Sequence, residues 1–579
     1  MDRSAHLAHP LEDPDLLLHI LLQSGINHDY DAQCPNPERA ALRGINSTAA
    51  KLIDGLCTSY RDTRRSGDAM LLIDPAGVAS RAAAALRQLG PLRHLQLEGL
   101  DDDALATVLA EAGRSASHSP SPGSPGQCRG LETLNLQRSV FSGTCLYTCH
   151  PDLTDALPER SPIIGDASLG AGLTAPSRLL PRLLELDLGG CGQLTDAGLE
   201  ALTAEAPLLK CLRITVNALL QRPRLSCPWL RSATISICAN LQDDAVNSLC
   251  HGAPLLQELN LWRCSSLASP VIRAPYLETL NMCECVELTD SALRSISMCD
   301  TISSLLLAGC EALGGTTLHW GGGNALTTLD VSDIVSTSDA QLTAACAASP
   351  DLARLDFSRS GVRVQSPVVG GPKLVTLLCT KCENLVDEAV STACDRSPVL
   401  TTLMLALCTS LHTPRIRGES LADLNLSGCF LLQDAAVSHA CAHCPSLSRL
   451  TLSLCAALIE PEVRGPSLKR IELSHAEQLR RPQIGGPKLE ELRLSGCSNL
   501  EDDAVEQACN NSPKLRRLAI SGCAKLSSAR VASASLRELV CHSVSRDVVD
   551  VAADRMSCPH LTKIVCETYA DAEGFEEVN

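Results

Sequence analysis

The sequence predicts an α/β solenoid, a curved stack of short repeats with a parallel β-sheet on the concave face and short helices or extended segments on the convex face. The first observation is a nine-residue pattern, L-x-x-L-x-L-x-x-C, that recurs from Leu183 almost to the end of the chain. It reads LLELDLGGC at 183–191, LQELNLWRC at 256–264 and LADLNLSGC at 421–429. About seventeen such units follow one another at roughly 21 to 26 residues, and since one unit cannot bury its leucines alone, neighbours must stack.

The residue types within one unit predict its packing. Leu421, Leu424 and Leu426 alternate with polar residues and are expected to point into the core. Cys429 takes the ninth position, where commoner leucine-rich repeats carry asparagine. A thiol there packs as a small hydrophobe whose weak S–H donor can serve the backbone of the adjacent turn.

Long and short repeats alternate. In the long ones a helix is expected to begin at Asp434 and to end near Cys441, because Pro445 biases the residue before it away from the helical region. The acidic pairs that open such helices, Asp243-Asp244 and Asp502-Asp503, suit the helix dipole.

The short repeats leave no room for a helix. AALIEPEVRGPSL follows Cys455 and SSLASPVIRAPYL follows Cys264, so the next strand comes after about 21 residues. Their prolines predict an extended, polyproline-like return. The alternation is expected to vary the curvature along the coil.

Composition narrows the classes of protein. Hydrophobic residues make up 45% and charged residues 20% of the 579, enough for a sizeable core. Thirty cysteines in 579 residues are a lower density than a disulfide scaffold carries, and the recurring ones fall at a core position of the repeat. A reducing compartment, cytoplasmic or nuclear, is therefore expected. The N-terminus lacks the features of a signal peptide, and no apolar stretch is long enough to span a membrane. A net charge of −17 argues against a nucleic-acid partner.

The chain divides into four parts. Residues 1–66 lack the repeat and are expected to form a small helical segment, and 67–182 hold irregular repeats with strands at 92–100 and 131–136. A Ser/Pro/Gly-rich insert at 114–126 is expected to be disordered. The regular array covers 183–566 and an acidic tail covers 567–579.

The opening helix of the N-terminal segment carries a second pattern. Residues 11–22 read LEDPDLLLHILL, and 37–61 read as a helix pair after an apparent insertion. The pattern resembles an F-box, the helical module that docks onto the Skp1 adaptor of cullin-type ubiquitin ligases. The residues that match, and that the resemblance implies would contact the adaptor, are Leu11, Pro14, Leu16, Leu17, Ile20 and Leu21.

Two features depart from the F-box pattern. Pro14 does not follow the first leucine directly, and no tryptophan occurs before Trp229. The alternative is that residues 1–66 cap the end of the coil without binding Skp1.

The repeats themselves resemble those of F-box proteins with cysteine-containing repeats, most of all the plant F-box/LRR-repeat protein 15 group. The phrases that carry the likeness are CGQLTDAGL at 191–199 and CVELTDSAL at 285–293, together with the alternation of long and short units. The resemblance implies a substrate receptor: the F-box would hold the ligase core while the solenoid selects a protein for ubiquitin transfer by partner enzymes.

Catalytic, cofactor and metal sites are not predicted. Cys379-x-x-Cys382 and Cys441-x-x-Cys444 have metal-ligand spacing, but they lie several repeats apart and fall at repeat positions that favour core packing. The glycines at 321–323 lack the lysine that phosphate binding needs. The chain is therefore expected to be a binding protein rather than an enzyme.

The concave surface is expected to carry the partner site. Strand geometry places the third, fifth and seventh positions of each unit there, a row that includes Glu185, Asp187, Glu258, Asn260, Trp262, Asn281, Asp330, Arg354, Asp356, Glu472, Arg493 and Arg517. Tryptophan and arginine are enriched at interface hot spots, so Trp262 beside Arg263 is a candidate anchor. The alternative is that Trp262 packs on the neighbouring strand. Arg354, Arg359 and Lys381 form a second, basic candidate.

The sequence thus predicts a substrate-recognition subunit of a Skp1–cullin–F-box ligase that binds its target through the concave sheet. The first alternative is a repeat scaffold that binds proteins without a ligase. A small-molecule co-receptor ranks last, because no basic, polar pocket is evident at the loop rim.

Overall fold

The structure is a computed structural model that describes residues 182–314, 326–545, 548 and 557–565, together with four strands nearer the N-terminus. It divides into two compact units, Met1–Leu288 and Thr289–Asn579. The predicted adaptor residues Leu11, Pro14, Leu16, Leu17, Ile20 and Leu21 lie outside the described residues, as do the insert at 114–126 and the tail at 567–579.

In the N-terminal unit, β1 (Tyr60–Thr63) pairs antiparallel with β2 (Asp68–Ile73), and the sheet continues in parallel from β2 onward. The strand at Tyr60 corrects the expected helix pair, which was to run to Arg61. β3 (His94–Leu97) and β4 (Thr133–Asn135) confirm the two strands expected among the irregular repeats. The regular elements are β5 (Glu185–Gly189), α8 (Asp196–Glu205), β6 (Cys211–Thr215), β7 (Ser232–Ser236), α9 (Asp243–Gly252), β8 (Glu258–Asn260) and β9 (Thr279–Asn281).

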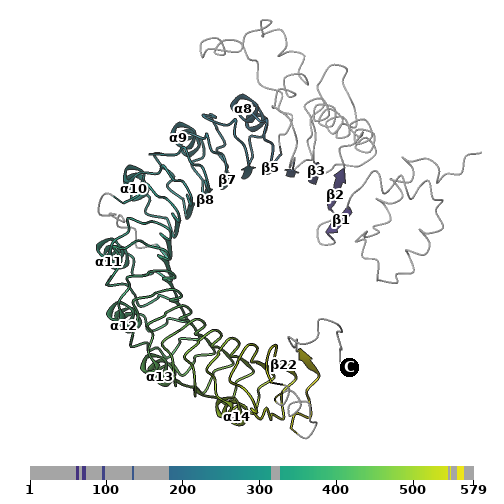
Figure 1. Ribbon diagram of the computed structural model, residues 1–579. Helices are drawn as coiled ribbons and strands as arrows, with labels where there is room; N and C mark the ends of the chain where they lie inside the picture. The colour runs from purple at the N-terminus through teal and green to yellow at the C-terminus, as the bar shows by residue number, and fades with distance from the viewer. Residues whose placement is uncertain are drawn as a thin grey trace, which may run out of the picture. The chain divides into compact units, whose positions relative to one another are not determined.

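In the C-terminal unit the strands lie side by side in parallel along the inner side of the curve, and the helices lie on its outer side (Figure 1). Its strands are β10 (Ser304–Leu306), β11 (Thr328–Asp330), β12 (Arg354–Asp356), β13 (Thr376–Leu378), β14 (Thr402–Met404), β15 (Asp423–Asn425), β16 (Arg449–Thr451), β18 (Arg470–Glu472), β20 (Glu491–Arg493), β21 (Arg517–Ala519), β22 (Glu538–Val540) and β23 (Lys563–Val565). Its helices are α10 (Asp290–Ile296), α11 (Asp339–Ala348), α12 (Asp387–Arg396), α13 (Asp434–His443) and α14 (Asp502–Asn510). Within the described residues, no helix has the length and apolar character that crossing a bilayer requires.

The leucines and the ninth-position cysteine of each repeat form the core, as predicted. Leu424, Leu426 and Cys429 are fully buried. The Cys429 thiol donates to the backbone oxygen of Leu405 in the preceding repeat, with 3.2 Å between sulfur and oxygen. The same bond between consecutive repeats is made by Cys264, Cys285, Cys382, Cys408, Cys455, Cys497 and Cys523. The chain is a leucine-rich-repeat solenoid. Its ninth-position thiols donate the hydrogen bond to the backbone at the position where commoner repeats carry asparagine.

Burial keeps these thiols protonated. It raises the pKa of Cys429 to about 12 and that of Cys497 to about 11, against weaker backbone hydrogen bonds that act in the other direction. Since the S–H donates to a carbonyl, the protonated thiol is the form that the packing requires. The buried cysteines are therefore structural donors and poor nucleophiles.

Each helical repeat supplies acceptors to the helix-free repeat that follows it. The Asp434 carboxylate accepts from the backbone N–H groups of Ile459 and Glu460 at 3.0 and 2.9 Å, and Ser438 one turn later accepts from Glu462 at 3.2 Å. The equivalent aspartates, each accepting two backbone N–H groups of the next repeat, are Asp196, Asp243, Asp339, Asp387 and Asp502. An extended return has no partners of its own for these groups, so this bonding explains why the two repeat types alternate.

Within the part of the chain that the structure describes, the alternation breaks once, where two short repeats follow each other between β16 and β20. There the two returns bond to each other as the parallel strands β17 (Glu462–Arg464) and β19 (Gln483–Gly485). The polyproline-like return expected after Cys455 is therefore wrong for residues 462–464. No second helix is available, and a backbone ladder satisfies the exposed N–H groups instead.

The two neighbouring aspartates at the start of α14 allow two stabilising effects to be measured separately: the hydrogen bonds to the next repeat and the interaction with the helix dipole. Asp502 accepts from the N–H groups of Ser527 and Ser528, whereas Asp503 in the same turn makes no such bond. We expect Asp502→Ala to lower the free energy of unfolding by about 1–2 kcal/mol, since charged acceptors are lost. Asp503→Ala should cost about 0.5 kcal/mol, the value of the dipole alone. Urea denaturation followed by circular dichroism measures both, and equal losses would contradict the bridge.

Candidate protein-binding face

The side chains at the third and fifth positions of each repeat point away from the buried residue at the fourth position. In β8, Glu258 is exposed, Leu259 is buried and Asn260 is half-buried. Most other strands of the sheet likewise bury their middle residue between more exposed neighbours, and the exceptions include Glu491 in β20 and Ala519 in β21, which are buried. The predicted row on the inner face is thus placed as expected at its third and fifth positions.

Several fifth-position residues are used by the fold. The Asn260 side-chain oxygen accepts from the backbone N–H of Trp262 at 3.0 Å, and this bond turns the chain out of the strand. Asp187, Asn281, Asp330, Asp356 and Asn425 make the same bond to the residue two positions on. These residues, all but Asn425 named in the predicted row, therefore have a structural role, and their short Asx side chains two residues before a turn are the sequence signal for it.

The candidate anchor Trp262 is joined to the next repeat. Its indole N–H donates to Glu284 at 3.1 Å, and the Arg263 Nε donates to the other oxygen of that carboxylate at 2.5 Å. The Arg263 guanidinium also lies 5.1 Å from the centre of the Trp262 ring. The half-buried ring is thus bonded to the next repeat, while Arg263 stays exposed.

The second candidate set lies in neighbouring repeats. Arg354 is 3.8 Å from Asp356, and Arg359 is 3.0 Å from Asp333, so both cations have an acidic partner. Lys381 follows the next strand and makes no ion pair within the described residues. The three side chains form a surface that is less basic than the sequence suggested.

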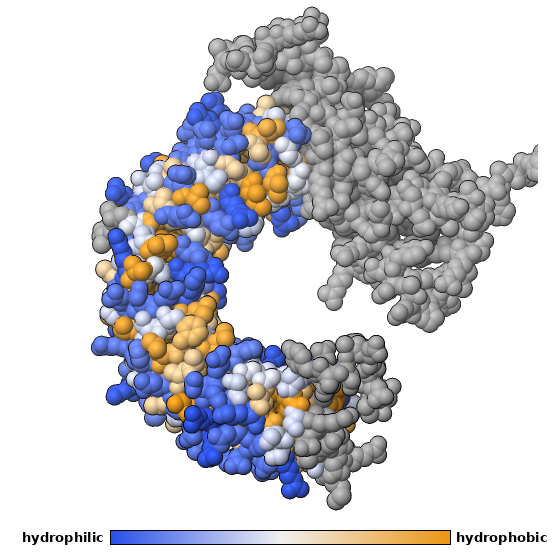
Figure 2. Space-filling model, viewed as in Figure 1, coloured by the Kyte–Doolittle hydropathy of each residue, from blue (hydrophilic) through white to orange (hydrophobic). Residues whose placement is uncertain are grey.

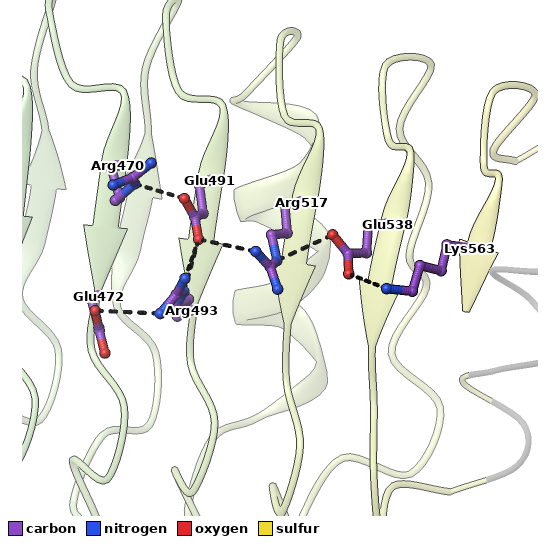
Figure 3. Close-up of polar contacts among 7 residues, drawn as sticks. All are labelled: Arg470, Glu472, Glu491, Arg493, Arg517, Glu538 and Lys563. Carbon is purple, nitrogen blue, oxygen red and sulfur yellow. Dashed lines mark hydrogen bonds and ion pairs between the residues drawn. The ribbon is translucent and has the colours of Figure 1, made fainter. Parts of the chain in front are cut away.

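A continuous row of charge occupies the third position from β15 to β23 (Figure 3 shows its C-terminal part). We call this set the inner charge row: Asp423, Arg449, Arg470, Glu491, Arg517, Glu538 and Lys563. Ion pairs link its members: Arg449 with Asp423 at 2.8 Å, Arg470 with Glu491 at 2.6 Å, and both Arg517 and Lys563 with Glu538 at 3.3 Å.

Glu491 is the centre of this row. It is 8% exposed and accepts from Arg470 and from Arg493, whose Nη2 lies 2.7 Å away, while Arg517 lies at 3.9 Å. Burial by itself raises the pKa of Glu491, but the surrounding guanidiniums outweigh it and leave that pKa below its ordinary value. The carboxylate is therefore ionised at neutral pH and holds three cations in place.

Sequence reasoning named only Glu472, Arg493 and Arg517 from this region. The remaining members escaped because each looks ordinary within its own repeat. Aligning the repeats would have found them, since RIE, ELR and RLA at 470–472, 491–493 and 517–519 place charge at one position in consecutive units.

The cysteine pairs with metal-ligand spacing are part of the core. Cys379, Cys382, Cys441 and Cys444 are all buried, which confirms their predicted packing role. No group of three or more potential ligands among the described residues is arranged to hold a metal ion.

On the face shown in Figure 2, hydrophobic residues gather in separate patches among hydrophilic ones.

No protein family model matches the chain, and no curated protein matches it. Solved structures with a similar arrangement include the Rad7 and Elc1 complex in yeast (14% identity over 79% of this chain and 85% of that one, TM-score 0.32). YopM from Yersinia enterocolitica is 16% identical over 96% of both chains (TM-score 0.34), and the leucine-rich repeat domain of the type III effector XopL is 18% identical over 58% of this chain and all of that one (TM-score 0.28). At these identities and TM-scores the likenesses carry no argument about binding, and the fold assignment depends on the repeats and strands of the chain itself.

Proposed function

We propose that the chain is the substrate-recognition subunit of a Skp1–cullin–F-box ubiquitin ligase and that it selects a protein through the inner face of its C-terminal unit. The inner charge row is the observation that carries the recognition half. Its arginines are held by Glu491 and Glu538 yet remain about half exposed, at 50% for Arg470 and 43% for Arg517. Arginines held in place lose little entropy on binding, and arginine is enriched at interface hot spots.

The ligase half depends on the F-box-like sequence of the first 66 residues. Leu16, Leu17, Ile20 and Leu21 would form the apolar face that meets the adaptor. In this arrangement the chain binds and positions its target, and partner enzymes transfer ubiquitin.

Co-purification with a Skp1 adaptor tests the ligase half. The full chain should retain Skp1, and a Leu16→Asp/Leu17→Asp double variant should lose it, because charge on an apolar docking face is costly. Arg470→Glu, on the solenoid, is the matched control and should retain Skp1 fully. Failure of the intact chain to bind would remove the ligase assignment and leave a leucine-rich-repeat scaffold that binds proteins on its own.

A further inference from the structure

We propose that the inner charge row acts together with an apolar patch at the edge of β14–β16 to bind an extended protein segment that carries one large apolar residue and, a few residues away, carboxylates. This deepens the recognition half of the proposed function and names the chemistry of its target. The patch, called the edge patch below, consists of Leu407, Phe430, Leu431 and Leu454.

The edge patch is formed by three consecutive repeats. Its side chains are 39–48% exposed, although each is large and apolar. Leu407 and Leu454 take the same position on either side of Gly428, and backbone bonds of 2.7 Å from Leu407 to Ser427 and from Gly428 to Ser453 tie the three turns together. Phe430 and Leu431 follow in the middle repeat, after the buried Cys429. Contiguous exposed apolar groups on a soluble protein mark an interaction site.

The backbone of this patch is strained. Leu407 and Leu454 have φ values of 61° and 63°, in the left-handed region that a bulky side chain rarely adopts. The eighth position has this conformation in other repeats too: glycine takes it without that cost at 190, 309, 428, 496 and 522, and non-glycine residues such as Val216 and Lys381 take it with the cost. A Cβ on Gly428 would come within 2.5 Å of the Leu407 side chain, so the glycine leaves room for the leucine. Glycine at 407 and 454 would therefore adopt this backbone conformation at a lower free-energy cost than the leucines that are found there.

The neighbouring part of the inner charge row also carries a local cost. Arg449 and Arg470 are paired residues of adjacent strands, and like charges directly opposite each other destabilise a sheet. Arg449 pairs through Nη1 with Asp423 and Arg470 pairs through Nε with Glu491, and both guanidiniums stay about half exposed. A carboxylate bound here would relieve the repulsion and accept bidentate bonds.

The two features are spaced for one bound segment. The edge patch lies at the eighth position of a repeat and the inner charge row at the third, so five residues separate them. Their fully extended length of about 16 Å is an upper limit, because the chain turns after the fifth position. An extended segment of roughly five or six residues spans it. In a chain of net charge −17, the row holds four cations and three anions, which favours an acidic partner.

Selection from a random peptide library displayed on phage, with the full chain as bait, tests the proposal. Enriched peptides should share a large apolar residue and carboxylates a few positions away. Their affinity, measured by fluorescence anisotropy, should fall at least tenfold in Leu454→Ser and in Arg470→Glu, and should weaken with added salt. Matched controls are Val399→Ser, an equally exposed valine outside the patch, and Arg415→Glu, an exposed arginine on a helix-free return. Neither should change binding. Leu454→Ser and the two controls should keep the parent melting temperature within a few degrees, whereas Arg470→Glu faces the buried Glu491 carboxylate, so its binding is measured well below its own melting temperature.

Other outcomes overturn the proposal. The proposal is wrong if the enriched peptides lack acidic residues. It is also wrong if neither Leu454→Ser nor Arg470→Glu affects binding. If binding were lost in Trp262→Ala instead, the chain would still be a protein-binding protein, but its binding site would lie at Trp262 and not at the edge patch and the inner charge row. Residues 567–579 contain Phe575 followed by Glu576 and Glu577. A chain lacking that tail that binds peptides far more tightly than the full chain would identify the tail as the occupant and rule out the separate partner.

Discussion

Phe357→Ala is expected to lower the free energy of unfolding by about 3–5 kcal/mol, the usual cost of removing a fully buried phenylalanine. Phe357 is fully buried at a sixth position that leucine fills in most repeats, and it ranks among the largest side chains so enclosed. Its backbone oxygen also accepts from the Cys382 thiol of the next repeat, so a collapse at this site would disturb the contact between repeats. Stability in a solenoid depends on such nearest-neighbour contacts.

Hydrogen exchange of the native chain, together with urea denaturation, measures this effect. Amides of β12 and β13 should lose protection first in the variant. Phe430→Ala is the matched control: it removes the same side chain from a site that is 43% exposed and should cost less than about 1 kcal/mol. Equal losses in the two variants would contradict the packing described for Phe357.

Glu491→Gln is expected to cost about 2–3 kcal/mol at neutral pH, toward the low end for breaking a buried ion pair because its three arginines are partly exposed. The amide keeps the shape of the side chain but leaves Arg470, Arg493 and Arg517 without their shared counter-charge. Glu472→Gln is the matched control. Glu472 is 3.9 Å from a single arginine and more exposed, so its loss should cost below about 1 kcal/mol.

The effect of Glu491 depends on pH in a defined direction. Its pKa lies below the ordinary value of 4.5 in the folded chain, so its stabilising contribution is fully present above 4.5. The contribution is lost as the pH falls through the lower, folded-state pKa. The difference in unfolding free energy between the parent chain and Glu491→Gln should therefore be constant near neutrality and shrink in acid. A difference that grows in acid would contradict the depressed pKa.

Much of the fold could be predicted because the residue pattern within each repeat determines where its strand and its helix lie. Leucine at the first, fourth and sixth positions sets the strand register, and an aspartate before a small apolar helix sets the long repeat. The predicted helix at Asp434 and the buried thiol of Cys429 were both confirmed. The β17–β19 pair escaped, because it forms only when two short repeats adjoin and their returns meet through backbone bonds.

The candidate site divides in the same way. Alternation along a strand was enough to place Trp262 and Arg354 at the protein surface. It could not show that the Trp262 ring bonds to Glu284, or that Asn260 serves its own turn, since both depend on distances between repeats. The inner charge row is the clearest case: its members are about 21 to 26 residues apart in the chain and become neighbours only when the repeats stack.

The sequence alone determined that this protein is a stack of leucine-rich repeats with cysteine in the core, because a repeated local pattern can bury its apolar residues in only one way. The tertiary structure decided which side chains meet across repeats. Asp434 bridges to Ile459 and Glu460, Glu491 gathers three arginines, and Leu407 lies against Gly428. Those contacts depend on the register between neighbouring strands, and that register is set by the bonds of the whole sheet rather than by any one repeat.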